Sequence, residues 1–264
     1  MKIDHGKRAI AGARALVTGA NGGLGVALVD TLLSRGAVQV HAAMRNIANT
    51  PDHWRGDDRI RPLIFDLTRH DLIEKAAALG PSLDLIVHNA GVTCIGPVSE
   101  KDDAQVRQTM EVNYFGPARL TRLVSEEMSH RQAGMIFVLS MAAMIPPGPA
   151  PIYSASKSAC AMYAAGVLAD LGKRGLEVML AFPGYIDTPM AAAFSSFKAT
   201  PAEIAENMLD SWESGKTHVF PDKFSSTVFE YMTSNGGRML IDTENVRHEI
   251  AEYYNSWSSS QNKK

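Results

Sequence analysis

The chain has 264 residues, of which 45% are hydrophobic and 20% charged, and its net charge is −2. This composition supports a substantial core, and the length suits one α/β domain or at most two small ones. The near-neutral charge, without a long run of one sign, argues against nucleic acid as a partner. No apolar stretch reaches the roughly 18 residues that a membrane span needs, which argues against a membrane partner.

The first 20 residues include basic side chains but lack the long apolar core of a signal peptide. The only cysteines, Cys94 and Cys160, show no spacing typical of a disulfide, and we expect two buried free thiols in a reducing cytosol. We therefore predict a cytoplasmic protein. We expect a single domain over 1–264, with flexible ends at 1–11 and 256–264.

Strand-like and helix-like segments alternate along the chain. Short β-rich runs predict strands at 14–19, 38–44, 61–67, 83–91, 134–140, 176–184 and 216–222. Helical spacing predicts helices at 23–36, 68–80, 100–112, 114–131, 200–215 and from about Tyr153 to Lys173. Continuous apolar strands between helices are typical of a parallel sheet that is covered on both faces. The predicted fold is a doubly wound, Rossmann-type α/β sheet of about seven strands.

Residues that favour the ends of helices or strands help to define some of these boundaries. Gly36 stands where a helix C-cap belongs, and Thr68 is expected to begin the second helix as its N-cap. Thr200, followed by Pro201 and by Glu203 three positions on, has the pattern of a capping box. Pro62 must lie at the very start of the third strand, because proline lacks the N–H that a central strand position needs.

The first predicted strand leads directly into "TGANGGLG", residues 18–25, and then into a helix. Glycines at such a turn let the backbone approach a pyrophosphate, which then lies at the positive end of the helix dipole. The alternative is a glycine-rich turn without a ligand. Its position between the first strand and the first helix favours a dinucleotide site.

Tyr153 and Lys157 lie four positions apart in a predicted helix, with Ser140 thirteen positions before Tyr153. Residues at that spacing share one helix face, so the phenol and the ammonium can meet. An ammonium one turn away favours the phenolate form of a tyrosine, which suits acid–base work. Each residue also has an ordinary interpretation: Tyr153 as a packing residue, Lys157 as a solvated lysine and Ser140 as a strand-end cap.

These motifs together resemble the short-chain dehydrogenase/reductase family over roughly residues 12–221. The resemblance rests on T-G-x-x-x-G-x-G with Gly19, Gly23 and Gly25, on "DL" at 66–67, on "NAG" at 89–91, on Asn113 in "EVNYFG", on Ser140 with Y-x-x-x-K, and on "PGYIDTPM" at 183–190. Six such motifs occur in the family's order, each near its expected strand end. The match implies hydride transfer between a nicotinamide and a carbonyl or alcohol.

The resemblance also implies roles for individual residues. Tyr153 would be the acid/base, Lys157 would tune it and bind the nicotinamide ribose, and Ser140 would hold the substrate oxygen. Asn113 would help hold a water for a proton relay, although an ordinary turn or cap asparagine is the alternative. The implied cofactor contacts, besides Tyr153 and Lys157, are Gly19, Asn21, Gly23, Leu24, Gly25, Arg45, Asp66, Leu67, Asn89, Ala90, Gly91, Pro183, Gly184, Ile186 and Thr188.

Two departures from the family pattern bear on the site. His88 stands where the family usually has an asparagine, and the segment after Thr188 is short and rich in alanine. The apolar run "MAAMIPPGPAPI", residues 141–152, follows Ser140, and its Met141 and Met144 suit either the core or a pocket wall. We expect a fairly apolar, uncharged substrate. The eight histidines show no metal-ligand spacing, and we propose no metal.

The second predicted strand ends with Met44 and Arg45, at the place where an NAD-specific site usually carries an acidic residue. An arginine there can bind a 2′-phosphate through charge-assisted contacts. The alternative is an exposed arginine near a strand end. We therefore predict NADP(H) as the cofactor.

The sequence predicts an NADP-dependent carbonyl reductase of the short-chain type. The alternatives are an NAD-dependent alcohol dehydrogenase and a catalytically idle dinucleotide sensor; a sugar-nucleotide epimerase on a related fold is disfavoured by the short chain. The Ala-rich helix at 154–171 suits packing between subunits, and family members are often dimers or tetramers. A homodimer or homotetramer is expected.

Overall fold

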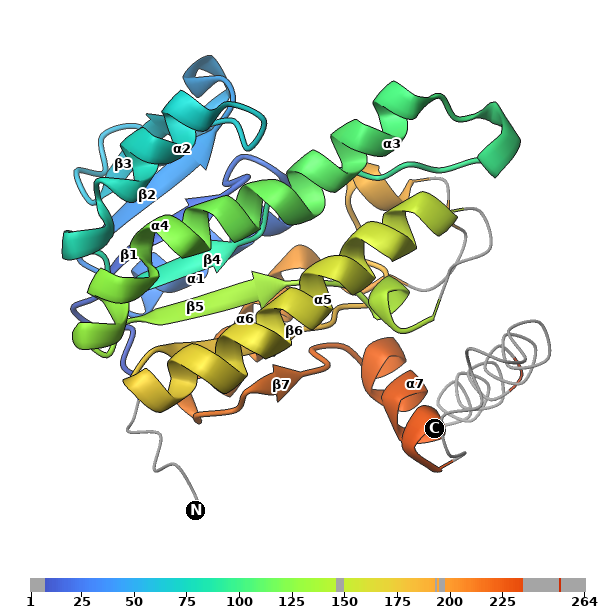
Figure 1. Cartoon of the computed structure of the whole chain (residues 1–264). Helices are drawn as coiled ribbons and strands as arrows, with labels where there is room; N and C mark the ends of the chain where they lie inside the picture. The colour runs from blue at the N-terminus through green and yellow to red at the C-terminus, as the bar shows by residue number, and fades with distance from the viewer. Residues whose placement is uncertain (1–7, 146–149, 193, 195–197, 235–251, 253–264) are drawn as a thin grey trace.

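The computed structural model describes residues 8–145, 150–192, 194, 198–234 and 252. In this part of the chain, parallel strands form one seven-stranded sheet in the order β3-β2-β1-β4-β5-β6-β7 (Figure 1). The strands are β1 (Arg14–Thr18), β2 (Gln39–Met44), β3 (Ile60–Ile64), β4 (Leu85–His88), β5 (Gly134–Val138), β6 (Glu177–Ala181) and β7 (His218–Val219). The predicted doubly wound α/β fold is confirmed.

Helices cover both faces of this sheet. Those described are α1 (Gly23–Ser34), α2 (His70–Ala77), α3 (Asp103–Met110), α4 (Gly116–His130), α5 (Pro151–Leu171), α6 (Pro201–Glu213) and α7 (Lys223–Ser234). Helices α1 and α6 pack together on one face, while α2, α4 and α5 cover the other (Figure 1). The order of the strands reverses beside β1, which is the arrangement that opens a ligand crevice at the carboxyl ends of the strands.

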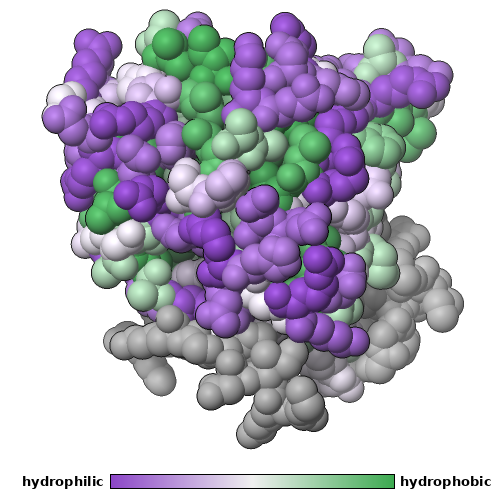
Figure 2. Space-filling view, turned by 60° about the vertical axis from the view of Figure 1, so that its left-hand side comes forward, coloured by the Kyte–Doolittle hydropathy of each residue, from purple (hydrophilic) through white to green (hydrophobic). Residues whose placement is uncertain are grey.

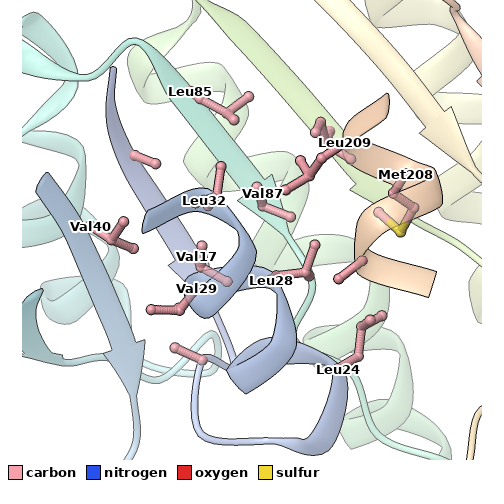
Figure 3. Packing of buried hydrophobic residues seen from close by; sticks show 14 of the residues in the cluster. Val17, Leu24, Leu28, Val29, Leu32, Val40, Leu85, Val87, Met208 and Leu209 are labelled. Carbon is pink, nitrogen blue, oxygen red and sulfur yellow. The ribbon is translucent and has the colours of Figure 1, made fainter. Parts of the chain in front are cut away.

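Aliphatic side chains fill the layer between the sheet and α1 and α6. Leu28 and Leu32 of α1 and Leu209 of α6 converge on Val17 of β1 and Val87 of β4 (Figure 3). A second buried cluster lies on the opposite face of the sheet, around the ring of Phe137. Burying the apolar side chains of the strands and of the helices that cover them is the main stabilising term of such a fold.

The outer surface is mixed in character. Hydrophilic residues cover most of the face in Figure 2, and hydrophobic residues gather in smaller patches in its upper half. Of the helices that the structure describes, none combines the length and the apolar character that crossing a bilayer would require. Cys94 and Cys160 are both buried and free, as predicted.

Three element boundaries differ from the prediction. Pro62 is the third residue of β3, not its start, because β3 is an edge strand whose outer side needs no donor. Thr68 does not cap α2: it donates from N and Oγ1 to Oδ1 of Asp66, and the helix begins two residues later. The last strand is only His218–Val219.

The predicted break between two helices around Asn113 is also wrong. Helix α3 continues through a π-helical turn, Glu111–Phe115, into α4. Thr200 does cap α6, since its side chain accepts from the N–H of Glu203.

The N-terminal segment was expected to be flexible over 1–11, but its described part packs against the body of the protein. Arg8 pairs with Glu177 and stacks over the ring of Trp212, 4.4 Å from the guanidinium carbon to the ring centroid. Ile10 is fully buried. These residues pack against the protein because the side chain of Ile10 is buried and the ion pair of Arg8 attaches the segment to β6. The other segment, 256–264, lies outside the described residues.

Candidate active site

A cavity of about 760 Å³ opens at the carboxyl ends of the strands. Its walls come from the segments that follow β1, β2, β3, β4, β5 and β6, together with residues of α3, α5 and α7. A cavity of this size can hold a drug-sized ligand or much of a dinucleotide. Of the predicted site residues, all except Asn113 line it.

The glycine turn forms one end of this cavity. Gly19 has a φ of +65°, and a Cβ placed on it would lie 2.8 Å from the Cα of Ala90. Helix α1 then begins at Gly23, and its N-cap, Gly22, makes no side-chain capping bond. Its first residues, Gly23, Leu24 and Gly25, line the cavity. A turn rich in glycine and a helix N-terminus make a cradle that fits a pyrophosphate.

Hydrogen bonds hold the "NAG" segment against this turn. The hydroxyl of Thr18 accepts from the backbone N–H groups of Asn89 and Ala90, at 3.0 Å each. The amide of Asn89 donates to the backbone oxygens of Thr18 and Gly19, at 2.9 and 3.2 Å. Thr18 was not among the predicted site residues, although it is the first letter of the glycine motif. Asn89 and Thr18 thus fix the shape of the turn.

The three residues Ser140, Tyr153 and Lys157 line the same cavity. Tyr153 is in the first turn of α5, and Ser140 follows β5, where its hydroxyl accepts from the N–H of Ala142 at 3.1 Å. Lys157 is 5% exposed; its Nζ donates to the backbone oxygen of Val138 at 2.9 Å and lies 5.9 Å from the centroid of the Tyr153 ring. A buried ammonium near a phenol suits proton transfer at one wall of the cavity.

Asn113 lies behind the cavity wall rather than in it. Its amide donates to the backbone oxygen of Val92 and to Oγ of Ser156, and its Oδ1 accepts from the N–H of Val92, all at 2.9 Å. The side chain is therefore fully used within the protein. A Cβ placed on Gly91 would lie 3.3 Å from Oδ1 of Asn113 and 3.5 Å from Nζ of Lys157. Asn113 thus joins the β4 loop to α5 close to the lysine.

Arg45 and Asp66 lie on the cavity at the ends of the two outermost strands on the β3 side. Arg45 is exposed, and no ion pair engages it among the residues that the structure describes. Asp66 uses Oδ1 to accept from Thr68. A free guanidinium beside the second strand can meet a phosphate.

The loop after β6 forms the opposite wall. The N–H of Met141 donates to the oxygen of Pro183 at 2.9 Å, and the N–H of Gly184 donates to Oδ2 of Asp222 at 2.8 Å. A Cβ placed on Gly23 would lie 2.6 Å from Cγ2 of Thr188. This loop therefore closes over the glycine turn.

The rest of the lining is largely apolar. Met141 is a cavity residue as well as a buried one, while Met144 packs into the core and does not line the cavity. Residues 146–149 of the predicted apolar wall lie outside the described part. Ile145, from the predicted apolar run, also lines the cavity. Lining residues that the sequence did not predict include Ile95, Val112, Tyr185, Phe194 and Phe224. Tyr185 lies within the segment 183–190 that resembles the family, but no sequence pattern indicates Phe224.

His88 is buried below the site, on β4. Its ring stacks on Phe137 with 4.6 Å between centroids, and its Nε2 lies 3.1 Å from Oγ1 of Thr121. Burial lowers the pKa of His88 to about 3, so the ring is neutral in the folded protein. The histidine serves packing here. No cluster of three potential metal ligands occurs within the described stretches.

Comparison with known proteins gives the family. The family model for short chain dehydrogenases matches residues 13–199. A curated relative, the NADPH-dependent 1-acyldihydroxyacetone phosphate reductase of Saccharomyces cerevisiae, is 31% identical over 186 residues, which are 67% of this chain and 62% of the yeast protein. The 3-oxoacyl-[acyl-carrier-protein] reductase FabG of Escherichia coli is 28% identical over 69% of this chain and 76% of its own length. The matched part thus spans less than two thirds of the yeast relative.

Solved structures agree in fold. A short chain dehydrogenase from Burkholderia cenocepacia, in complex with NADP, superposes with a TM-score of 0.81 at 31% identity, covering 89% of this chain and 97% of that one. A short-chain dehydrogenase from Sphingobium yanoikuyae, in complex with NADPH, shares the fold with a TM-score of 0.76 at 16% identity, over 88% and 96% of the two chains. Together with the glycine turn and the Ser140, Tyr153 and Lys157 set, these matches establish that the chain belongs to the short-chain dehydrogenase/reductase family of oxidoreductases.

Proposed function

We propose that the protein is an NADP(H)-dependent oxidoreductase that interconverts a carbonyl and an alcohol on a fairly apolar small molecule. One observation carries the proposal: Ser140, Tyr153 and Lys157 line the same cavity as the glycine turn and the N-terminus of α1. The cofactor cradle and the groups that would transfer the proton therefore line the same cavity. Family membership supports the reaction class.

The cofactor assignment rests on the two ends of the cavity. The turn at Gly19 and the first residues of α1 would hold the pyrophosphate, and Arg45 would hold a 2′-phosphate by charge-assisted hydrogen bonds. The yeast relative is NADPH-dependent by name, and the Burkholderia structure contains NADP. When bound, a nicotinamide supplies or accepts the hydride.

The residues around Tyr153 would handle the proton. Its hydroxyl would donate to the carbonyl oxygen in reduction and accept from the alcohol in oxidation. Nζ of Lys157, held by the backbone oxygen of Val138, would place a positive charge beside the ring of Tyr153 during proton transfer. Ser140 would hydrogen-bond the substrate oxygen and keep it within reach of the phenol. Asn113 supports this arrangement from behind by holding the backbone of Val92.

Purified protein assayed with NADPH and NADH against ketones, aldehydes, quinones and keto acids tests the proposal, followed by the reverse reaction with matching alcohols. We expect the highest kcat/KM for NADPH with an uncharged, apolar carbonyl. Preference for NADH with an alcohol would instead favour the NAD-dependent dehydrogenase. Tight dinucleotide binding with no turnover on the panel would favour the idle sensor.

Two further assignments go with this function. Helix α5 presents Met162, which is 77% exposed, on an alanine-rich surface, and this supports a homodimer or homotetramer built through that helix. The two buried free thiols suit a reducing compartment, and this supports the proposed cytoplasmic location. Light scattering of the purified protein at several concentrations tests the assembly, and Met162→Glu is the variant expected to weaken it.

A further inference from the structure

The C-terminal segment beyond the family match brings a buried carboxylate to the active-site loop. Asp222 is 5% exposed and immediately precedes α7. Its Oδ1 accepts from the N–H of Ser225, and its Oδ2 accepts from Oγ of Ser225 and from the N–H of Gly184, all at 2.8 Å. One side chain therefore caps α7 and links it to a loop that lies 38 positions earlier in the chain.

Gly184 and Phe224 are packed against each other at this junction. A Cβ placed on Gly184 would lie 2.6 Å from Cδ1 of Phe224 and 2.9 Å from Oδ1 of Asp222. The ring of Phe224 thus rests directly on the backbone of Gly184, a contact that no larger residue at 184 would permit. Both residues line the cavity. The start of α7 and the loop after β6 therefore form one wall.

Three aromatic side chains, two from the connection between β6 and α6 and one from α7, meet on that wall. The ring of Tyr185 lies 5.4 Å from Phe224 and 5.0 Å from Phe194, centroid to centroid, with interplanar angles of 51° and 44°. We refer to Tyr185, Phe194 and Phe224 as the aromatic wall. All three line the cavity that also contains Ser140 and Tyr153. None of them carries a formal charge at neutral pH, so the wall suits an apolar ring rather than an anion.

We propose that Phe224 is a specificity-determining residue, which selects carbonyl substrates by the size of an aromatic ring placed against the wall. Asp222 is its positioning residue, since it holds the first turn of α7 to Gly184. This inference rests on the proposed function and names its substrate class: ketones and aldehydes with an aromatic group beside the carbonyl. It also gives the segment after β7 a role in the site.

The test is ketone binding, which requires no turnover. Dissociation constants of acetophenone and of 2-acetylnaphthalene are measured calorimetrically for the protein alone and with saturating NADP⁺. The ring-size preference is the ratio of the first constant to the second. Phe224→Ala removes the ring and opens space, so we expect the preference to shift toward the naphthyl ketone by at least about five-fold.

A matched control uses the same helix. Phe229 is also on α7, but it stacks on Phe220, 4.0 Å away, and does not line the cavity. Phe229→Ala should leave the ring-size preference within about two-fold of the parent. If Phe224→Ala melts below the assay temperature, Phe224→Leu keeps an apolar side chain and is tested in the same way. Equal preferences in the Phe224 and Phe229 variants, or no binding of either ketone by the parent, would overturn the proposal.

The variant Asp222→Asn separates the two roles of the carboxylate, which are to cap α7 and to accept from the N–H of Gly184. An amide can still accept from the N–H of Ser225 through its oxygen, but its NH₂ then faces the N–H of Gly184. We expect a shift of ring-size preference in the same direction as in Phe224→Ala. The control Ser225→Ala removes a different bond to the same carboxylate and should leave the preference unchanged. Identical behaviour of the Asp222 and Ser225 variants would refute the positioning role.

Failure of this inference is distinguishable from failure of the proposed function. Binding that responds to ring size as expected, with no oxidation of NADPH or NADH, supports the aromatic wall and refutes the oxidoreductase assignment. If the protein turns over aromatic ketones but Phe224→Ala leaves the ring-size preference unchanged, the oxidoreductase assignment is supported and the role of the aromatic wall is refuted.

Discussion

Nζ of Lys157 donates a hydrogen bond to the backbone oxygen of Val138, 2.9 Å away, at the end of β5. The lysine is therefore held by the sheet at the point where the cavity begins. Its Nζ also lies 5.9 Å from the centroid of the Tyr153 ring, and Lys157 lines the same cavity as the glycine turn. This position makes Lys157 the residue whose loss should affect both binding and chemistry.

Replacing Lys157 with alanine should lower both the rate and the affinity for NADPH. A charged hydrogen bond contributes roughly 1.5–3 kcal/mol, which corresponds to about a 10- to 150-fold weaker Kd. Fluorescence titration gives Kd, and steady-state kinetics gives kcat. Lys173→Ala, on an exposed lysine after α5, is the control and should change neither quantity. An unchanged Kd in Lys157→Ala would show that the lysine acts on the tyrosine alone.

Tyr153→Phe should abolish most turnover while preserving cofactor binding, because only the proton donor is removed. General acid–base groups typically contribute a factor of about 10²–10⁴, and we expect kcat to fall within that range. Tyr163→Phe is the matched control: Tyr163 is on the same helix, its hydroxyl donates to the oxygen of Ala118, and it does not line the cavity. Rates in Tyr153→Phe close to those of the parent would remove Tyr153 from the mechanism.

Arg45→Asp should weaken NADPH binding by about 10-fold or more and affect NADH much less, because the new carboxylate repels a 2′-phosphate. The measurement is kcat/KM for both cofactors at fixed ionic strength, in the parent and the variant. Arg174→Asp makes the same charge change at an exposed position that does not line the cavity. A parent that prefers NADH, or an equal loss for both cofactors, would contradict the role of Arg45.

His88 makes the stability of the fold depend on pH. Its folded-state pKa of about 3 is below the ordinary value of 6.5, so the unfolded chain binds a proton that the folded chain excludes. The contribution of the neutral His88 ring to the free energy of unfolding is complete above pH 6.5. It is lost as the pH falls from 6.5 toward 3, by at most about 1.4 kcal/mol per pH unit. Between pH 7.5 and pH 5 the loss is about 2 kcal/mol.

The test compares urea unfolding of the parent and of His88→Asn across this pH range. The difference in unfolding free energy between the two should move by about 2 kcal/mol in favour of the variant at pH 5. Other titrating groups cancel in that difference. His130→Asn, at an exposed histidine at the end of α4, should show no such trend. A difference that is independent of pH would mean that His88 does not titrate on unfolding.

The alternation of elements and the glycine turn were readable from the sequence because they depend on local pattern. Seven strands, the helix after Gly23 and the face shared by Tyr153 and Lys157 follow from hydrophobic period and spacing alone. The break predicted between the helices at 100–112 and 114–131 is wrong. The amide of Asn113 bonds Val92 and Ser156, and these tertiary contacts stabilise a π-helical turn that local preference disfavours.

The aromatic wall was not predictable for a different reason. Phe224 reaches the cavity through the bond between Asp222 and Gly184, which joins residues 38 positions apart. The spacing of hydrophobic residues along the chain does not indicate a contact between residues so far apart. His88 illustrates the same limit, since its burial against Phe137 depends on the neighbouring strand β5.

The two outer strands limit how copies of this protein can associate. Pro62 removes a backbone donor from the middle of β3, and β7 offers only two residues for pairing. Neither margin of the sheet is a good template for a strand from another molecule, which protects the chain against edge-to-edge aggregation. Of the surfaces that the structure describes, helix faces are therefore better suited to self-association than the sheet edges, and a continuous intermolecular sheet is disfavoured even at high protein concentration.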